Sequence, residues 1–292
     1  MKRIFIPIFI FILLLTGCTP SAPPAQIAAT TLPVYEFTLR LCEGTDISVT
    51  RLVTEPVSCL HDYSLNVQQT KTAEAAEVIV QSGAGLEEAL EDMLINKDAI
   101  IDASAGIPLL CGAEEHREAH HDHEHSHAKD PHIWLSPENA KLMARNICTG
   151  LIGQYPQHAQ TFSANLEALL AELDALQAYG DDQLAGLSCR ELITFHDGFA
   201  YFADAFGLTI LEAVEEESGS EASARELKAL IQLTREHDLP AIFTEANGSC
   251  SAAEVIARET GAKLFTLDMA MSGNSYFDAM YRNIDTIKEA LE

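Results

Sequence analysis

The chain has 292 residues, of which 47% are hydrophobic, and its formal net charge at pH 7 is −26. This length and apolar content allow two modest domains with real cores. The acidic balance excludes the basic surface that nucleic-acid binding demands. It is compatible with attraction of cations, although most acidic surface is simply solvated.

The amino terminus indicates export. Lys2 and Arg3 precede a twelve-residue apolar run over 4–15, which is shorter than the roughly 20 residues of a membrane-spanning helix. The following Leu-Thr-Gly-Cys resembles a bacterial lipobox, which implies cleavage before Cys18 and lipid attachment to its sulfur. We therefore predict a signal peptide over 1–17 and a tether over 18–26. The mature protein would be extracytoplasmic and lipid-anchored to the cell membrane, with an uncleaved anchor as the alternative.

Beyond the tether, short apolar runs alternate with helical patterns, which is typical of parallel β-sheets with crossover helices. Four strand candidates precede and four follow one long helical segment. The strand candidates cover 27–31, 47–53, 77–81, 99–104, 192–196, 209–214, 241–245 and 263–268. The sequence therefore predicts an α/β protein with two similar halves.

The segment over 156–183 repeats apolar residues at three- and four-residue spacing, which predicts one long amphipathic helix. We predict an N-terminal lobe over 27–154, a rigid linking helix over 155–186 and a C-terminal lobe over 187–292. Each lobe would contain a mostly parallel four-stranded sheet flanked by helices. The alternative is an ordinary helix within one large domain.

Several helix boundaries are marked by capping residues. Ser136 before a proline indicates a helix start, Ser223 and Ser251 each precede a glutamate by three residues as in a capping box, and Gly261 indicates a helix end. A final amphipathic helix is predicted over 276–291.

Six histidines occur within twelve residues of a loop that we place at 114–129. They are His116, His120, His121, His123, His125 and His127. Imidazole is the commonest protein ligand for transition metals, and short histidine-rich tracts favour metal binding. We assign this tract to auxiliary metal capture. The alternative, a solvated loop, is disfavoured by the ordered DPHIWLSP sequence that follows it.

Four further side chains are candidates for one metal site. His61 follows the second predicted strand, His132 precedes a helix, and His196 and Asp268 end the fifth and eighth strands. Ligands gather at the carboxyl ends of parallel strands, so these side chains could meet between the lobes. Three imidazoles and one carboxylate satisfy tetrahedral zinc. Each residue alone is more often structural, and it is their shared placement that favours a site.

Three segments resemble the zinc/manganese-type solute-binding proteins of bacterial ABC importers. They are Asp130–Pro137, the sequence FHDGFAYF at 195–202, and the closing pattern from Glu245 to Asp268. The resemblance extends from residue 27 to the carboxyl terminus. It implies that His132, His196 and Asp268 bind metal, together with His61 of an H-x-Y motif.

The resemblance also implies a function. Histidine at the position of His196 resembles the zinc receptors, whereas manganese receptors tend to carry glutamate there; imidazole likewise suits zinc. The expected protein is a monomeric, high-affinity zinc receptor that carries Zn²⁺ to an ABC transporter membrane permease with a cytoplasmic ATPase. A manganese or iron receptor of the same family is the first alternative, in which Mn²⁺ would take the place of Zn²⁺.

Two other function classes are weaker alternatives, a secreted zinc hydrolase and a metal-buffering adhesin. Catalytic zinc keeps one coordination position open for water. The sequence has no H-E-x-x-H motif, and four protein ligands would fill a tetrahedron. We therefore do not expect an enzyme.

The sequence departs from the family pattern at two places. Cys59 stands near His61 where the family usually has a proline-containing turn, so it could replace or supplement a ligand, although a disulfide is favoured in an oxidising location. After Asp268, the usual Pro-Leu-Gly is replaced by the residues 269–273. Glu245 is a tempting fifth ligand, but we expect it to pair with a nearby cationic group, and we expect Trp134 to pack behind His132.

Six cysteines remain after Cys18, an even number that suggests disulfides in an exported protein. They are Cys42, Cys59, Cys111, Cys148, Cys189 and Cys250. Their spacing does not assign partners.

Overall fold

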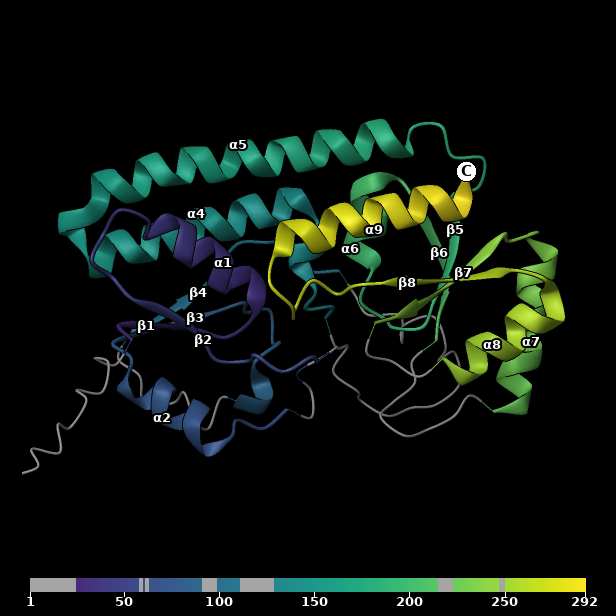
Figure 1. Ribbon diagram of the computed structural model, residues 1–292, viewed down its shortest axis with the longest axis horizontal. Helices are drawn as coiled ribbons and strands as arrows, with labels where there is room; N and C mark the ends of the chain where they lie inside the picture. The colour runs from purple at the N-terminus through teal and green to yellow at the C-terminus, as the bar shows by residue number, and fades with distance from the viewer. Residues whose placement is uncertain are drawn as a thin grey trace, which may run out of the picture.

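The protein was analysed as a computed structural model that describes residues 25–57, 60, 63–90, 99–110, 129–214, 223–246 and 250–292 (Figure 1). The described strands form two parallel sheets of four strands each. The first contains β1 (Ile27–Ala29), β2 (Val49–Arg51), β3 (Val78–Gln81) and β4 (Ile100–Asp102). The second contains β5 (Glu191–Thr194), β6 (Thr209–Ala213), β7 (Ala241–Glu245) and β8 (Lys263–Leu267). The predicted fold class is confirmed, with every predicted strand present.

Both sheets have the same strand order, β2-β1-β3-β4 in one and β6-β5-β7-β8 in the other, with all pairs parallel. In the first sheet the chain moves outward to one side from β1 to β2 and then to the other side from β3 to β4, so the direction of winding changes between β1 and β3. Ligands of such sheets bind beyond the carboxyl ends of the two strands at this point. In the second sheet that position lies beyond β5 and β7.

Helices cover the sheets. They are α1 (Leu32–Leu41), α2 (Val67–Ala75), α4 (Pro137–Gln154), α5 (Ala159–Leu184), α6 (Ala200–Phe206), α7 (Ala224–Glu236), α8 (Ser251–Thr260) and α9 (Tyr276–Leu291). Short 3₁₀ turns occur at Glu88–Leu90, Ile133–Leu135 and Pro156–His158. Within the described residues, no helix combines the length and the apolar character that a membrane crossing requires.

The long helix α5 joins the two lobes, as predicted. It begins at Ala159 rather than at Pro156, because Pro156–His158 form a separate 3₁₀ turn. In Figure 1 it runs above both sheets, and it packs against α1 and α4 on one side of the molecule and against α6 and α9 on the other. Its apolar face is buried at Leu173 and Leu176.

Three of the four predicted helix boundaries are confirmed. The Ser136 hydroxyl accepts from the backbone of Asn139, Ser223 forms a complete capping box, and Gly261 ends α8 with a left-handed φ of 85°. The prediction for Ser251 is wrong, because α8 already begins at that residue and Cys250 is its N-cap. A capping residue has non-helical backbone angles, and Ser251 has entered the helix.

One hydrophobic core extends through both lobes. Phe37 of α1 contacts Tyr276 of α9 edge-to-face at 5.0 Å, and the Tyr276 hydroxyl donates to the Trp134 carbonyl at 2.8 Å. The N terminus of α9 is also held from the other lobe, because the Tyr276 amide donates to Glu36 at 2.5 Å. A second, smaller core lies between the second sheet and helices α7 and α8. These contacts fix the lobes relative to each other around the carboxyl edges of the sheets.

Candidate metal centre

His132 is held in a buried position at the entrance to α4. It lies directly before the 3₁₀ turn Ile133–Leu135, and its side chain is only 2% exposed. Asp130 Oδ1 accepts from the His132 amide at 2.8 Å and lies 2.8 Å from the ring atom Nδ1. Trp134 is fully buried and lies edge-on to the imidazole at 5.4 Å, which confirms that it packs behind His132. Its indole nitrogen donates to the Met269 carbonyl at 2.7 Å, so the C-terminal lobe helps to fix this wall.

His196 comes from the opposite lobe. It follows β5 by two residues, and its Nδ1 lies 3.4 Å from Oε2 of Glu245 at the end of β7. The Glu245 side chain is 4% exposed, so its carboxylate faces the imidazole in a nearly dry environment. Glu245 was expected from the sequence to pair with a nearby cationic group, and in the structure its carboxylate instead faces the imidazole of His196.

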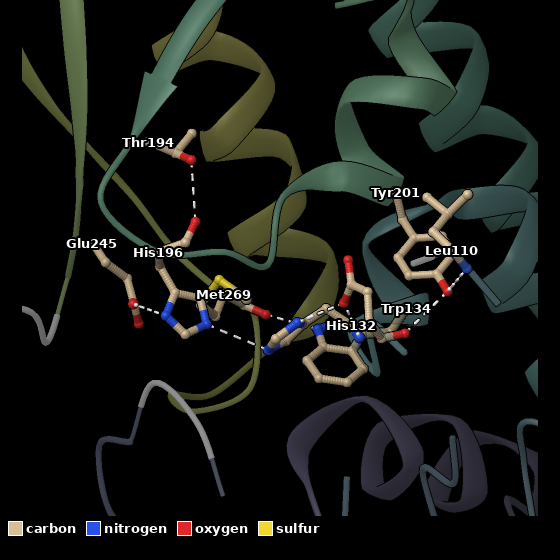
Figure 2. Close-up of polar contacts among 9 residues, drawn as sticks. Leu110, His132, Trp134, Thr194, His196, Tyr201, Glu245 and Met269 are labelled. Atoms are coloured by element: carbon tan, nitrogen blue, oxygen red, sulfur yellow. Dashed lines mark hydrogen bonds and ion pairs between the residues drawn. The ribbon is translucent and has the colours of Figure 1, made fainter. Parts of the chain in front are cut away.

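The two imidazoles meet between the lobes. Figure 2 shows Nε2 of His196 pointing at Nε2 of His132, and these atoms are 3.4 Å apart. Two nitrogens that each lie about 2.0–2.1 Å from a tetrahedral zinc ion are separated by about 3.3–3.4 Å. In metal sites, the second ring nitrogen of a ligating histidine usually contacts a carboxylate or carbonyl, and both histidines have this arrangement. This geometry is compatible with one cation bound by both rings, which stays a prediction.

Gly198 makes this close approach possible. A Cβ atom at this position would lie 2.5 Å from Met269 Cε, 2.7 Å from His196 Cδ2 and 3.0 Å from His132 Nδ1. Any larger side chain would therefore push the histidines apart. Sequence reasoning did not identify Gly198 as a site residue, although the glycine two positions after His196 was a usable signal.

Asp130 was also missed as an individual site residue. Its second carboxylate oxygen, Oδ2, is buried and has no hydrogen-bond partner among the described residues. A carboxylate with one such oxygen in a buried environment favours positive charge nearby. Its other oxygen contacts His132 Nδ1, so the carboxylate lies directly behind the imidazole.

Asp268 has a different environment in this structure. Its Oδ1 accepts from the Ala270 amide at 2.8 Å, and its Oδ2 lies 3.2 Å from Arg282 Nη2. Asn283 hydrogen-bonds to both the amide and the carbonyl of Asp268. Across the described parts of the chain, no three or more His, Cys, Asp or Glu side chains are grouped to hold a metal. The structure therefore brings together two of the four predicted ligands, and a role for Asp268 stays a prediction.

Several predicted residues lie outside the described residues. They are the ligand candidate His61, the tract His116–His127, the lipidation site Cys18 with its signal peptide, and the cysteines Cys59 and Cys111. The other cysteines, Cys42, Cys148, Cys189 and Cys250, are free, so the expectation of disulfides is wrong for these four. Burial raises the pKa of Cys42 to about 12, which keeps it as an unreactive thiol within the core.

The chain was compared with known proteins. Residues 27–290 match the family described as zinc-uptake complex component A, periplasmic. A Treponema pallidum (strain Nichols) protein with a proposed metal-binding role is 30% identical, with alignment to 96% of this chain and 93% of its own length.

Two further similarities agree with that match. The zinc-binding lipoprotein AdcA of Streptococcus pneumoniae serotype 4 is 28% identical over 91% of this chain, which spans only 56% of that longer protein. A crystal structure of ZnuA shares 30% identity and superimposes with a TM-score of 0.78, covering 92% of this chain and 100% of that one. On this evidence the chain belongs to the family of periplasmic zinc-uptake complex component A, whose members are metal-binding receptors of ABC importers.

Proposed function

We propose that this protein is an extracytoplasmic zinc receptor that delivers Zn²⁺ to the permease of an ABC importer. The observation that carries the proposal is the 3.4 Å separation of His132 Nε2 and His196 Nε2, which come from different lobes. A carboxylate faces the opposite nitrogen of each ring. An ion bound between these rings links the lobes, which is how a receptor can signal its loaded state to a partner.

Zinc is favoured over manganese by the donors. Both side chains that meet in the structure are imidazoles, which suit zinc, whereas manganese prefers oxygen-rich octahedral sites. We propose His61 and Asp268 as the remaining ligands. For Asp268 this requires the carboxylate to exchange its contact with Arg282 for the metal. The alternative, a manganese or iron receptor, would be indicated if one of those metals displaced Zn²⁺ in a competition experiment.

The chain's own residues would control binding in a simple way. Asp130 and Glu245 hold each imidazole with Nδ1 toward a carboxylate, which leaves Nε2 as the donor. Binding requires Nε2 to be unprotonated, so metal affinity should fall as the pH drops below the ordinary histidine range of about 6.5. Four protein ligands would leave no position for a reactive water, which is why we assign transport rather than hydrolysis.

The test is metal analysis of the untagged protein followed by calorimetric titration with Zn²⁺ and Mn²⁺ in competition. We expect one tightly bound Zn²⁺ that Mn²⁺ does not displace at equal concentration. His196→Ala should weaken binding at this tight site by at least about 10- to 100-fold. His158→Ala is the matched control, because His158 pairs with Asp46 away from the site. Displacement by equimolar Mn²⁺, or an unchanged affinity in His196→Ala, would overturn the assignment.

The tract His116–His127 is proposed as a low-affinity collector that raises the local metal concentration. Deletion of the tract should leave one tight equivalent and remove weaker ones. Loss of the tight site on deletion would make the tract a primary ligand source. Delivery itself is tested by uptake under zinc scarcity, which should fail in cells without this protein and distinguishes a receptor from a metal-buffering adhesin.

A further inference from the structure

Tyr201 connects the two lobes beside the histidine pair. It lies in α6, five residues after His196, and is 4% exposed. Its hydroxyl accepts from the Leu110 amide at 2.9 Å and donates to the Asp130 carbonyl at 3.0 Å (Figure 2). The Asp130 amide in turn donates to the Leu110 carbonyl at 3.0 Å. One hydroxyl from the C-terminal lobe therefore closes a ring of hydrogen bonds with two backbone segments of the N-terminal lobe.

The position of Asp130 determines the position of His132. Asp130 Oδ1 contacts both the amide and Nδ1 of His132. A shift in the Asp130 backbone would therefore be passed to the imidazole through two contacts. The hydroxyl of Tyr201 fixes that backbone relative to α6, and α6 follows directly from the segment that carries His196 and Gly198.

We propose that Tyr201 is a positioning residue that sets the separation of His132 Nε2 and His196 Nε2, an inference that rests on the proposed metal-binding function. A single segment of the C-terminal lobe then controls both imidazoles. It carries His196 itself and holds His132 through the Asp130 backbone. Tyrosine suits this task because one oxygen both accepts and donates. Phenylalanine would keep the ring but leave the Leu110 amide and the Asp130 carbonyl without this partner.

The experiment compares the full wild-type chain with Tyr201→Phe. Zinc affinity is measured by competition with a chromophoric chelator, and coordination geometry is measured from the absorption spectrum of bound Co²⁺. Tyr179→Phe is the matched control, because it removes a tyrosine hydroxyl of α5 that donates to Asp285 of α9 and contacts neither histidine. Residues that orient metal ligands typically alter affinity by about 10- to 100-fold when changed. We expect a loss in that range and an altered Co²⁺ spectrum for Tyr201→Phe, and neither effect for Tyr179→Phe.

The outcomes separate the two proposals. Wild-type protein that binds no zinc tightly would defeat the receptor function itself. Wild-type binding together with unchanged affinity and spectrum in Tyr201→Phe would overturn the positioning role alone, even if the melting temperature fell. If Tyr201→Phe does not fold, 4-aminophenylalanine at this position decides, because its amino group can donate to the Asp130 carbonyl but accepts poorly from the Leu110 amide. An altered Co²⁺ spectrum or a weakened zinc affinity in that variant supports the role of Tyr201, and wild-type affinity with an unchanged spectrum contradicts it.

Discussion

The two lobes have the same sheet order but hold their histidines differently. His132 in the N-terminal lobe is 2% exposed and is fixed by two 2.8 Å contacts with Asp130. His196 in the C-terminal lobe is 21% exposed, and its contact with Glu245 is longer at 3.4 Å. The N-terminal half of the site is therefore the more rigid half, and the C-terminal half has more freedom to adjust to an ion.

The packing behind the two histidines also differs, with more extensive apolar packing in the N-terminal lobe. Trp134 and the main core lie directly behind His132. The outer layer of the C-terminal lobe, formed by α7 and α8, instead has a small core of its own. Regions with fewer buried apolar contacts open locally at lower free energy. We therefore expect metal-dependent changes to be concentrated in the C-terminal lobe.

The largest expected effect is the loss of a ligand. His132→Ala should weaken zinc binding by more than about 100-fold, since even residues that only orient ligands cost 10- to 100-fold. The loss should exceed that of His196→Ala, because a rigid ligand contributes without reorganisation. Calorimetric titration of both variants measures the order. A larger loss in His196→Ala would reverse the assignment of the rigid half.

Replacing the carboxylates that contact the two imidazoles should weaken zinc binding in the same order, with a larger loss in the N-terminal lobe, but by smaller factors than replacing the histidines. Asp130→Asn is expected to weaken zinc binding by about 10- to 100-fold, and Glu245→Gln by an amount near the lower end of that range. The reason is the shorter contact between Asp130 and His132. Chelator competition measures both variants. Equal losses would mean that the length of the contact does not determine its importance.

A second buried carboxylate in the N-terminal lobe should make stability depend on pH. Glu87 accepts hydrogen bonds from the Thr30 hydroxyl and from the amides of Ser82 and Gly83. Burial nevertheless raises its pKa from 4.5 to about 6. The protonated form is thus favoured by folding, so its stabilising contribution is fully present below pH 4.5 and is lost as the pH rises through about 6. The expected loss is about 2 kcal/mol in the free energy of unfolding.

Denaturant unfolding between pH 4 and pH 7 (roughly the range spanning both pKa values) measures this effect. The decrease should be present in the wild-type protein and absent from Glu87→Gln, which cannot titrate. A decrease of the same size in both proteins would assign it to other groups.

The smallest effects concern one helix cap in each lobe. Asn66 caps α2 and Ser223 caps α7, each within a complete capping box. Replacement of either residue by alanine should cost about 1 kcal/mol of unfolding free energy. Hydrogen exchange should show that Ser223→Ala loosens α7 without affecting α2. Exchange that rises equally in both helices would indicate that the lobes open together and would contradict the expectation that the C-terminal lobe opens locally by itself.

The strands and the long helix could be predicted because their signals are local. Short apolar runs marked the eight strands found among the described residues, and the repeat over 156–183 marked α5. The error at Ser251 shows the limit of such signals. The S-x-x-E pattern predicted that Ser251 is the N-cap, but Cys250 is the N-cap and Ser251 is the first residue of the helix. His132, before a helix, and His196, after a strand, were predicted as ligands together with His61 and Asp268 from their placement and from the family resemblance, and the structure brings these two together.

What the sequence determined by itself was the order of elements, the two-lobed plan and a set of four candidate ligands that includes the two histidines that meet. Only the tertiary structure decided which nitrogen of each ring faces the partner, because the orientation of His196 depends on Glu245, which is remote from it along the chain, and because the two histidines come from different lobes. It also decided that Gly198 lies against both imidazoles and that the Tyr201 hydroxyl bonds to the backbone of the opposite lobe. Such distances arise from contacts between residues far apart in sequence, and no local pattern of side chains encodes them.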